Sequence, residues 1–209
     1  MLRIYAIVAG GLVIAATAGV FLYTQFAGEP DKYAQCRSTA IAGGASQIGG
    51  PFTLVDETGA TVTEAEVIDQ PALIYFGYTF CPDVCPLDTA RNAEAIDILE
   101  GRGLMVKPVF ISIDPERDTP EVVDAFTANL HERMLGLTGT PEQVRAASRA
   151  YRTFYQKQEP AAGEEDYYLV DHSTMSYLVF PEEGFVEVFQ RALRPDDLAD
   201  QIQCFLEAR

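Results

Sequence analysis

Positive charge is scarce in this 209-residue chain, which has 15 lysine and arginine residues against 31 aspartate and glutamate residues. The formal net charge is −16. Because a surface this acidic repels phosphate groups, nucleic acid and anionic lipid headgroups are excluded as main partners. A basic protein partner or a metal cation is compatible with this charge, as is an acidic surface that serves solubility alone.

Charge of either sign is absent from residues 4–26. These 23 residues are enough to span the hydrocarbon core of a bilayer as a helix. Arg3 precedes the segment and Glu29 follows it, so the positive-inside rule directs everything after the segment outward. We therefore expect a membrane anchor over residues 1–28, in a bacterial inner membrane, with the rest of the chain in the periplasm. A cleaved secretory signal is the alternative, although the end of the apolar run is a poor cleavage site.

The remainder divides into a linker over residues 29–47 and one globular domain over residues 48–209. Continuous apolar runs at residues 72–78 and 106–113 predict buried strands, with a helix between them. We expect an α/β, thioredoxin-like fold with an N-terminal β-hairpin, whose functional site lies at the carboxyl ends of strands. The other expected segments are a hairpin at 52–62, helices that open at Thr119 and Thr140, a hairpin at 175–189 and a helix from Pro195.

Cysteine is sparse, with four residues, and all of them follow the uncharged segment. This places them in an oxidising compartment. Cys36 precedes the domain and Cys204 lies in its last predicted helix. A disulfide between these two residues would tie the start of the domain to its end, although sequence alone does not fix the connectivity.

The other two cysteines lie in the segment from Cys81 to Pro86, between a predicted strand and a predicted helix. Pro86 lacks a backbone N–H and fits the first turn of a helix, which makes Asp83 the expected N-cap. Cys81 then lies on the loop and Cys85 in the first helical turn, where the helix dipole favours the thiolate. Two thiolates at this spacing can hold a soft metal ion or exchange electrons with another thiol pair. A stapling disulfide or two buried thiols without a function are the alternatives.

Three segments, in this order, resemble the Sco/SenC family: Phe76 to Pro86, Ser112 to Pro120, and Val170 to Ser173. The resemblance implies a thioredoxin-like, membrane-tethered protein that binds copper. It further implies a role in assembly of the dinuclear copper centre of cytochrome c oxidase subunit II, so that this subunit or another copper acceptor is the expected partner. The copper ligands implied by the resemblance are Cys81, Cys85 and His172.

The donor chemistry agrees with copper. Thiolates select Cu(I), and an imidazole makes Cu(II) accessible as well. Zinc is the chemical rival, because two cysteines, one histidine and a water also form a zinc site. The chain has only two histidines. His172 precedes a predicted core strand on the side where the cysteines are expected, whereas His131, beside Glu132 and Arg133, is expected to be exposed.

Two functions remain open. The first is a copper chaperone, which is not an enzyme in the turnover sense. The second is a thiol–disulfide reductase that keeps the acceptor's cysteines reduced and is itself restored by a periplasmic thiol reductant. Thioredoxin-type oxidoreductases resemble one another in a proline before the strand that faces the cysteines, but no proline lies between Pro160 and Pro181. This absence favours copper.

Two acidic residues, Asp114 and Asp118, follow the second predicted core strand. They could orient the site or meet a partner, although a strand-end turn and a helix lead-in are simpler roles. The aromatic side chains before the cysteine motif are expected in the core: Tyr75, Phe76, Tyr78 and Phe80.

Overall fold

The computed structural model describes residues 2–26, 31–37, 47–160, 163 and 167–209. The chain divides into two compact units, Met1–Gln35 and Cys36–Arg209. The first unit contains helix α1 (Leu2–Phe26), so the uncharged segment is helical. Within the described part of the chain, however, no helix combines the length and apolar character that crossing a membrane requires. The transmembrane assignment is therefore not confirmed and stays a prediction.

A seven-stranded sheet forms the centre of the second unit, in the order β2-β1-β5-β4-β3-β8-β9. The central strands β3, β4 and β5 are parallel to one another, and the outer pairs are antiparallel. All six residues of β3 are buried, which accounts for its continuous apolar sequence. The strands are β1 (Thr53–Asp56), β2 (Thr61–Thr63), β3 (Ala72–Gly77), β4 (Lys107–Ser112), β5 (Leu135–Thr138), β8 (Ser176–Phe180) and β9 (Gly184–Phe189).

A separate two-stranded antiparallel ribbon consists of β6 (Tyr155–Lys157) and β7 (Val170–His172). Neither of these strands, nor β5, was expected from the sequence. The predicted hairpins at both ends of the sheet are confirmed, as are the two buried strands within residues 72–78 and 106–113, which pair in parallel. The ribbon matters for function because it carries His172.

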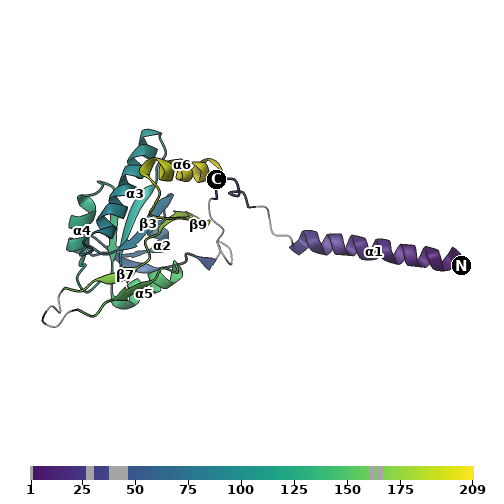
Figure 1. Cartoon of the computed structure of the whole chain (residues 1–209), viewed down its shortest axis with the longest axis horizontal. Helices are drawn as coiled ribbons and strands as arrows, with labels where there is room; N and C mark the ends of the chain where they lie inside the picture. The colour runs from purple at the N-terminus through teal and green to yellow at the C-terminus, as the bar shows by residue number, and fades with distance from the viewer. Residues whose placement is uncertain (1, 27–30, 38–46, 161–162, 164–166) are drawn as a thin grey trace. The chain divides into compact units, whose positions relative to one another are not determined.

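The helices begin where the sequence supplies their caps. Thr119 accepts a hydrogen bond from the Val122 N–H, and Thr140 forms a capping box with Gln143. In Figure 1, α3 and α6 pack together, and α5 lies apart from them towards the bottom of the view. The helices of this unit are α2 (Glu64–Val67), α3 (Val84–Gly101), α4 (Pro120–Ala128), α5 (Pro141–Ala150) and α6 (Pro195–Glu207).

The expectation that His131 is exposed is wrong, because its side chain is only 4% exposed. Nδ1 of His131 accepts the backbone N–H of Arg133 at 3.1 Å, so a neutral ring carries its proton on Nε2. Nε2 then donates towards Asp97 at 3.3 Å and Glu100 at 3.5 Å. This proton occupies the position that a metal ion would need, so the cluster ties the loop after α4 to α3.

Phe80 also departs from expectation. Tyr75, Phe76 and Tyr78 are buried as predicted, but Phe80 is 53% exposed. It follows the end of β3, where the chain has left the sheet, and the Arg117 guanidinium lies over its ring at 4.7 Å from the centroid. The last aromatic residue before Cys81 therefore belongs to the surface around the cysteines.

Candidate metal centre

Cys81 and Cys85 lie where β3 passes into α3. Asp83 is the N-cap of α3 and Val84 its first residue, which confirms the helix start expected from Pro86. The backbone N–H of Cys85 donates to Sγ of Cys81 at 3.2 Å. Both thiols are free, with Cys81 9% exposed and Cys85 fully buried. The start of the helix thus directs its unpaired N–H groups at the first sulfur.

The two thiols have opposite acidities. Burial alone raises the pKa of Cys81, but hydrogen bonds from the N–H groups of Cys85, Asp83 and Val84 outweigh it and lower the pKa. Deeper burial raises the pKa of Cys85 far above its ordinary value. Cys81 is therefore the readier thiolate, and Cys85 stays protonated until a cation or an electrophile offsets the cost of its charge.

His172 is the last residue of β7, and its side chain contacts Cys85. Its Nε2 lies 3.2 Å from Sγ of Cys85, and its Nδ1 lies 2.8 Å from the Ser173 carbonyl oxygen. A carbonyl oxygen can only accept, so Nδ1 carries the proton and the lone pair of Nε2 faces the sulfur. Burial lowers the pKa of His172, which favours the neutral ring. A neutral imidazole with a fixed tautomer is the form that binds a metal ion.

The donor atoms of Cys81, Cys85 and His172 all lie within 4.8 Å of one another. The structure thus brings together the three residues that the sequence singled out from separate segments. Two sulfurs and one imidazole nitrogen form a set suited to Cu(I) or Zn²⁺, and to Cu(II) through the nitrogen.

Two tyrosines hold the imidazole in place. The rings of Tyr75 and Tyr78 meet His172 edge-on, with centroids 6.3 Å and 5.8 Å away. The Tyr78 hydroxyl oxygen accepts the N–H of Val170 at 3.2 Å, which links the residue after β3 to the strand that carries His172. The Tyr75 hydroxyl donates to Asp88 at 3.1 Å. Sequence reasoning assigned both rings to the core and missed that they surround the histidine.

Asp118 organises the loop that leads to Cys81. Its carboxylate accepts the Thr79 N–H at 3.0 Å, the Thr79 hydroxyl at 2.5 Å and the Ser112 hydroxyl at 2.5 Å. Asp118 is fully buried. Asp114 accepts from Arg117 at 2.5 Å and from Tyr168 at 2.6 Å. Both carboxylates therefore bind other groups of the same domain. The hydrogen bonds of Asp118 to Thr79 agree with the expectation that Asp118 orients the site.

A disulfide joins Cys36 to Cys204, whose Cα atoms are 5.7 Å apart. Beside it, Arg37 donates to the Val186 carbonyl at 2.6 Å and pairs with the buried Glu187 at 3.4 Å. The bond fixes the start of the second unit to α6. It leaves Cys81 and Cys85 as the free thiols of the described chain.

Known proteins resemble this chain over nearly its whole length. A model of the SCO1/SenC family matches residues 41–207. The protein SenC of Rhodobacter capsulatus is 49% identical over 197 residues, which are 94% of this chain and 86% of that protein. Among solved structures, Arabidopsis thaliana ScoI with copper bound is 41% identical, with a TM-score of 0.71 over 77% of this chain and 99% of the other. Yeast Sco1 with copper bound is 34% identical, with a TM-score of 0.73 over 78% and 90% of the two chains. These likenesses confirm the thioredoxin-like α/β fold.

Proposed function

Because this chain belongs to the SCO1/SenC family, we propose that it is a copper chaperone whose ligands are Cys81, Cys85 and His172. The observation that carries the proposal is the 3.2 Å approach of the His172 Nε2 lone pair to Sγ of Cys85, with Sγ of Cys81 alongside. The ligands are ready before the metal arrives, because the histidine tautomer is fixed and one thiol is already acidic.

Copper fits this donor set better than zinc. Thiolates are soft ligands that favour Cu(I), and the Irving–Williams order places Cu(II) above Zn²⁺ for the same ligands. Two relatives whose structures contain copper, from Arabidopsis and yeast, are 41% and 34% identical to this chain. We infer that copper is the cargo, and that it passes to an acceptor by exchange of ligands at this partly open site.

The acceptor follows from the family resemblance. We propose that it is the dinuclear copper centre of cytochrome c oxidase, in subunit II, and that the chain assists its assembly. The uncharged segment 4–26 and the acidic residues after it favour a tether in the inner membrane with the copper site in the periplasm. A disulfide between Cys36 and Cys204 suits that oxidising compartment.

A thiol–disulfide reductase is the second candidate, and the acidity of Cys81 favours it. In that reaction the Cys81 thiolate attacks a disulfide of the acceptor and forms a mixed disulfide. Cys85 then attacks Cys81, releases the acceptor with both of its sulfurs as thiols, and leaves a Cys81–Cys85 disulfide. A periplasmic dithiol must reduce that disulfide before the next round.

Deletion and complementation in the native cells test the proposal. Cells without the protein should lose cytochrome c oxidase activity, and the unaltered gene should restore it. Added copper should restore part of the activity if delivery is the main task, whereas an added thiol reductant should do so if reduction is. If a Cys81→Ser, Cys85→Ser variant supports oxidase assembly at low copper, both functions are refuted.

A further inference from the structure

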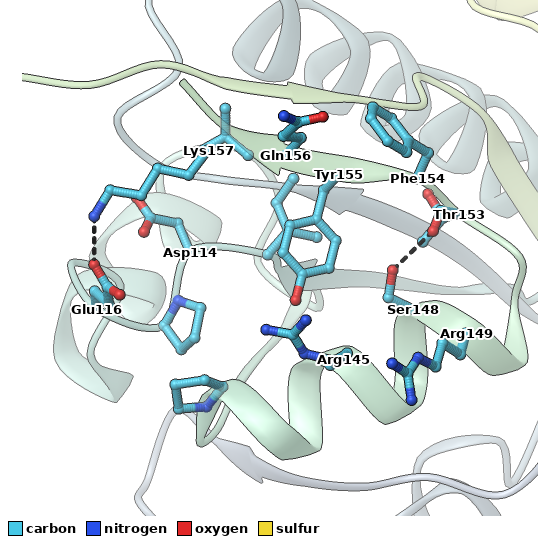
Figure 2. Close-up of a pocket in the computed structure, with 14 residues that line it drawn as sticks. Asp114, Glu116, Arg145, Ser148, Arg149, Thr153, Phe154, Tyr155, Gln156 and Lys157 are labelled. Carbon is cyan, nitrogen blue, oxygen red and sulfur yellow. Dashed lines mark hydrogen bonds and ion pairs between the residues drawn. The ribbon is translucent and has the colours of Figure 1, made fainter. Parts of the chain in front are cut away.

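A pocket of about 500 Å³ opens beside the ribbon of β6 and β7. Its walls come from the loop after β4, from helix α5 and from strand β6 (Figure 2). The charged residues that line it are Asp114, Glu116, Arg145, Arg149 and Lys157. The function proposed above uses none of them.

Both acids of the pocket already have cationic partners. Glu116 pairs with Lys157 at 2.7 Å, and Asp114 pairs with Arg117 at 2.5 Å. Within the described part of the chain, Arg145 and Arg149 have no ion-pair partner. Among the described residues that line it, the pocket therefore carries excess positive charge, on a chain whose formal charge is −16.

The two arginines lie four residues apart on α5, so they are neighbours on one helix face. Like charges at this spacing repel each other and destabilise the helix. An anion between them removes the repulsion, and a guanidinium matches a carboxylate through two parallel hydrogen bonds. The pair is thus suited to hold one or two carboxylates.

An aromatic side chain stands opposite the arginines. Figure 2 shows the ring of Tyr155 extending from β6 towards the guanidinium of Arg145. Phe154, which is 56% exposed, points away from the arginines in this view, so Tyr155 alone faces them. A phosphate or sulfate ion would leave this apolar surface and most of the volume unused. A ligand that places an apolar group next to a carboxylate uses both walls.

The pocket adjoins the metal centre through the ribbon. Tyr155 lies directly opposite His172 in the antiparallel register, and Lys157 lies opposite Val170. Directly opposed residues of an antiparallel pair carry their side chains on the same face. The face of the ribbon that presents His172 to the cysteines therefore continues into the pocket.

We propose that this pocket binds an acidic segment of the protein that exchanges copper or thiols with the site. A carboxylate of that segment pairs with Arg145 and Arg149, and a neighbouring apolar side chain packs on Tyr155. The identity of the partner rests on the proposed function, whereas the preference of the pocket for a carboxylate beside an apolar group does not. On a surface that otherwise repels acidic proteins, this pocket sets the orientation in which such a partner approaches His172.

Fluorescence anisotropy with the full, reduced, metal-free chain tests the pocket. The probe is a labelled peptide, blocked at both ends, in which two glutamates flank one phenylalanine. An Arg145→Gln, Arg149→Gln variant should bind it at least about tenfold more weakly than the unaltered chain. An Arg102→Gln, Arg194→Gln variant, which removes the same charge from exposed positions elsewhere, should bind within about twofold of the unaltered chain. A peptide with glutamines in place of glutamates should bind weakly to all three.

Equal binding by the Arg145→Gln, Arg149→Gln variant, or no binding at millimolar peptide, would overturn the proposal. Free glutarate distinguishes a small carboxylate from a protein segment. It should compete only at a concentration at least about tenfold above that of the unlabelled peptide, because it lacks the apolar group; competition at equal concentration would overturn the choice of a protein segment. Copper binding, measured separately, should be unchanged in the Arg145→Gln, Arg149→Gln variant, so failure of the copper function and failure of the pocket are distinct results.

Discussion

Nε2 of His172 lies 3.2 Å from Sγ of Cys85, although the two residues are 87 positions apart in the chain. Cys85 is held by the first turn of α3, and His172 by a strand outside the main sheet. The contact depends on Tyr78, which accepts the N–H of Val170 on that strand. The site is therefore assembled from three elements and is sensitive to changes in any of them.

The two motif thiols should differ in reactivity. In the reduced, metal-free chain at neutral pH, iodoacetamide should modify Cys81 well before Cys85, because N–H groups lower the pKa of Cys81 and burial raises that of Cys85. Peptide mapping after timed quenching measures both rates. Faster modification of Cys85 would contradict the assignment of Cys81 as the readier thiolate.

Two tyrosine hydroxyls offer a matched comparison. Tyr78→Phe leaves the Val170 N–H without its acceptor, which should cost about 1–3 kcal/mol of unfolding free energy and weaken Cu(II) binding. Tyr151→Phe removes a buried hydroxyl that has no hydrogen-bond partner among the described residues, so stability should be unchanged or slightly higher. Urea denaturation and copper titration of both variants provide the check. Equal effects of the two substitutions would show that Tyr78 acts through packing alone.

The Cys36–Cys204 disulfide should add stability. It closes a loop with a sequence separation of 168, for which the chain-entropy model gives an upper limit of about 5 kcal/mol. A Cys36→Ser, Cys204→Ser variant should melt at a lower temperature, also because the ion pair of the adjacent Arg37 with Glu187 is weakened. Non-reducing peptide mapping of the unaltered chain should find these cysteines joined. An unchanged melting temperature would argue that the bond adds no stability.

Asp118→Asn should destabilise the fold by about 1–3 kcal/mol, because the amide nitrogen cannot accept a hydrogen bond from Thr79 or Ser112, whereas both oxygens of the carboxyl group can, whether it is ionised or protonated. Burial raises the pKa of Asp118 above its ordinary value of 3.8. A raised pKa contributes stability that is present below pH 3.8 and is lost as the pH rises through the folded-state pKa. The loss of stability caused by Asp118→Asn should therefore be largest below pH 3.8 and become smaller as the pH rises through the folded-state pKa.

Thermal melts across acidic pH measure this deficit. Asp124→Asn, at an exposed position of α4, should differ from the unaltered chain by no more than about 0.5 kcal/mol. A loss of stability in Asp118→Asn that increases with pH would contradict the raised pKa of Asp118.

The sequence predicted strands β3 and β4, the two hairpins and the start of α3, because apolar runs, turn residues and a proline carry strong local signals. It missed β5, which contains Gly136, a residue that reads as a strand breaker. Added at Gly136, a Cβ would lie 2.4 Å from Cγ1 of Val123, so close helix packing requires the glycine.

The ribbon that carries His172 was missed for a different reason. Its strands have three residues each and are partly exposed, so they show neither a continuous apolar run nor a clear alternation. Burial of His131 was missed because it depends on Asp97 and Glu100, acids of a distant helix that no local pattern reveals.

Titration of the reduced chain with Cu(I) and Cu(II), followed by metal content and thiolate absorbance, tests the central claim most directly. The unaltered chain should bind one copper, and His172→Ala should lose Cu(II) binding, because two thiolates alone suit Cu(II) poorly. His131→Gln, which alters the other histidine of the chain, should bind as the unaltered chain does. Oxidation to a Cys81–Cys85 disulfide should abolish tight binding, and reduction should restore it. Unchanged stoichiometry and affinity in His172→Ala would contradict the three-ligand site.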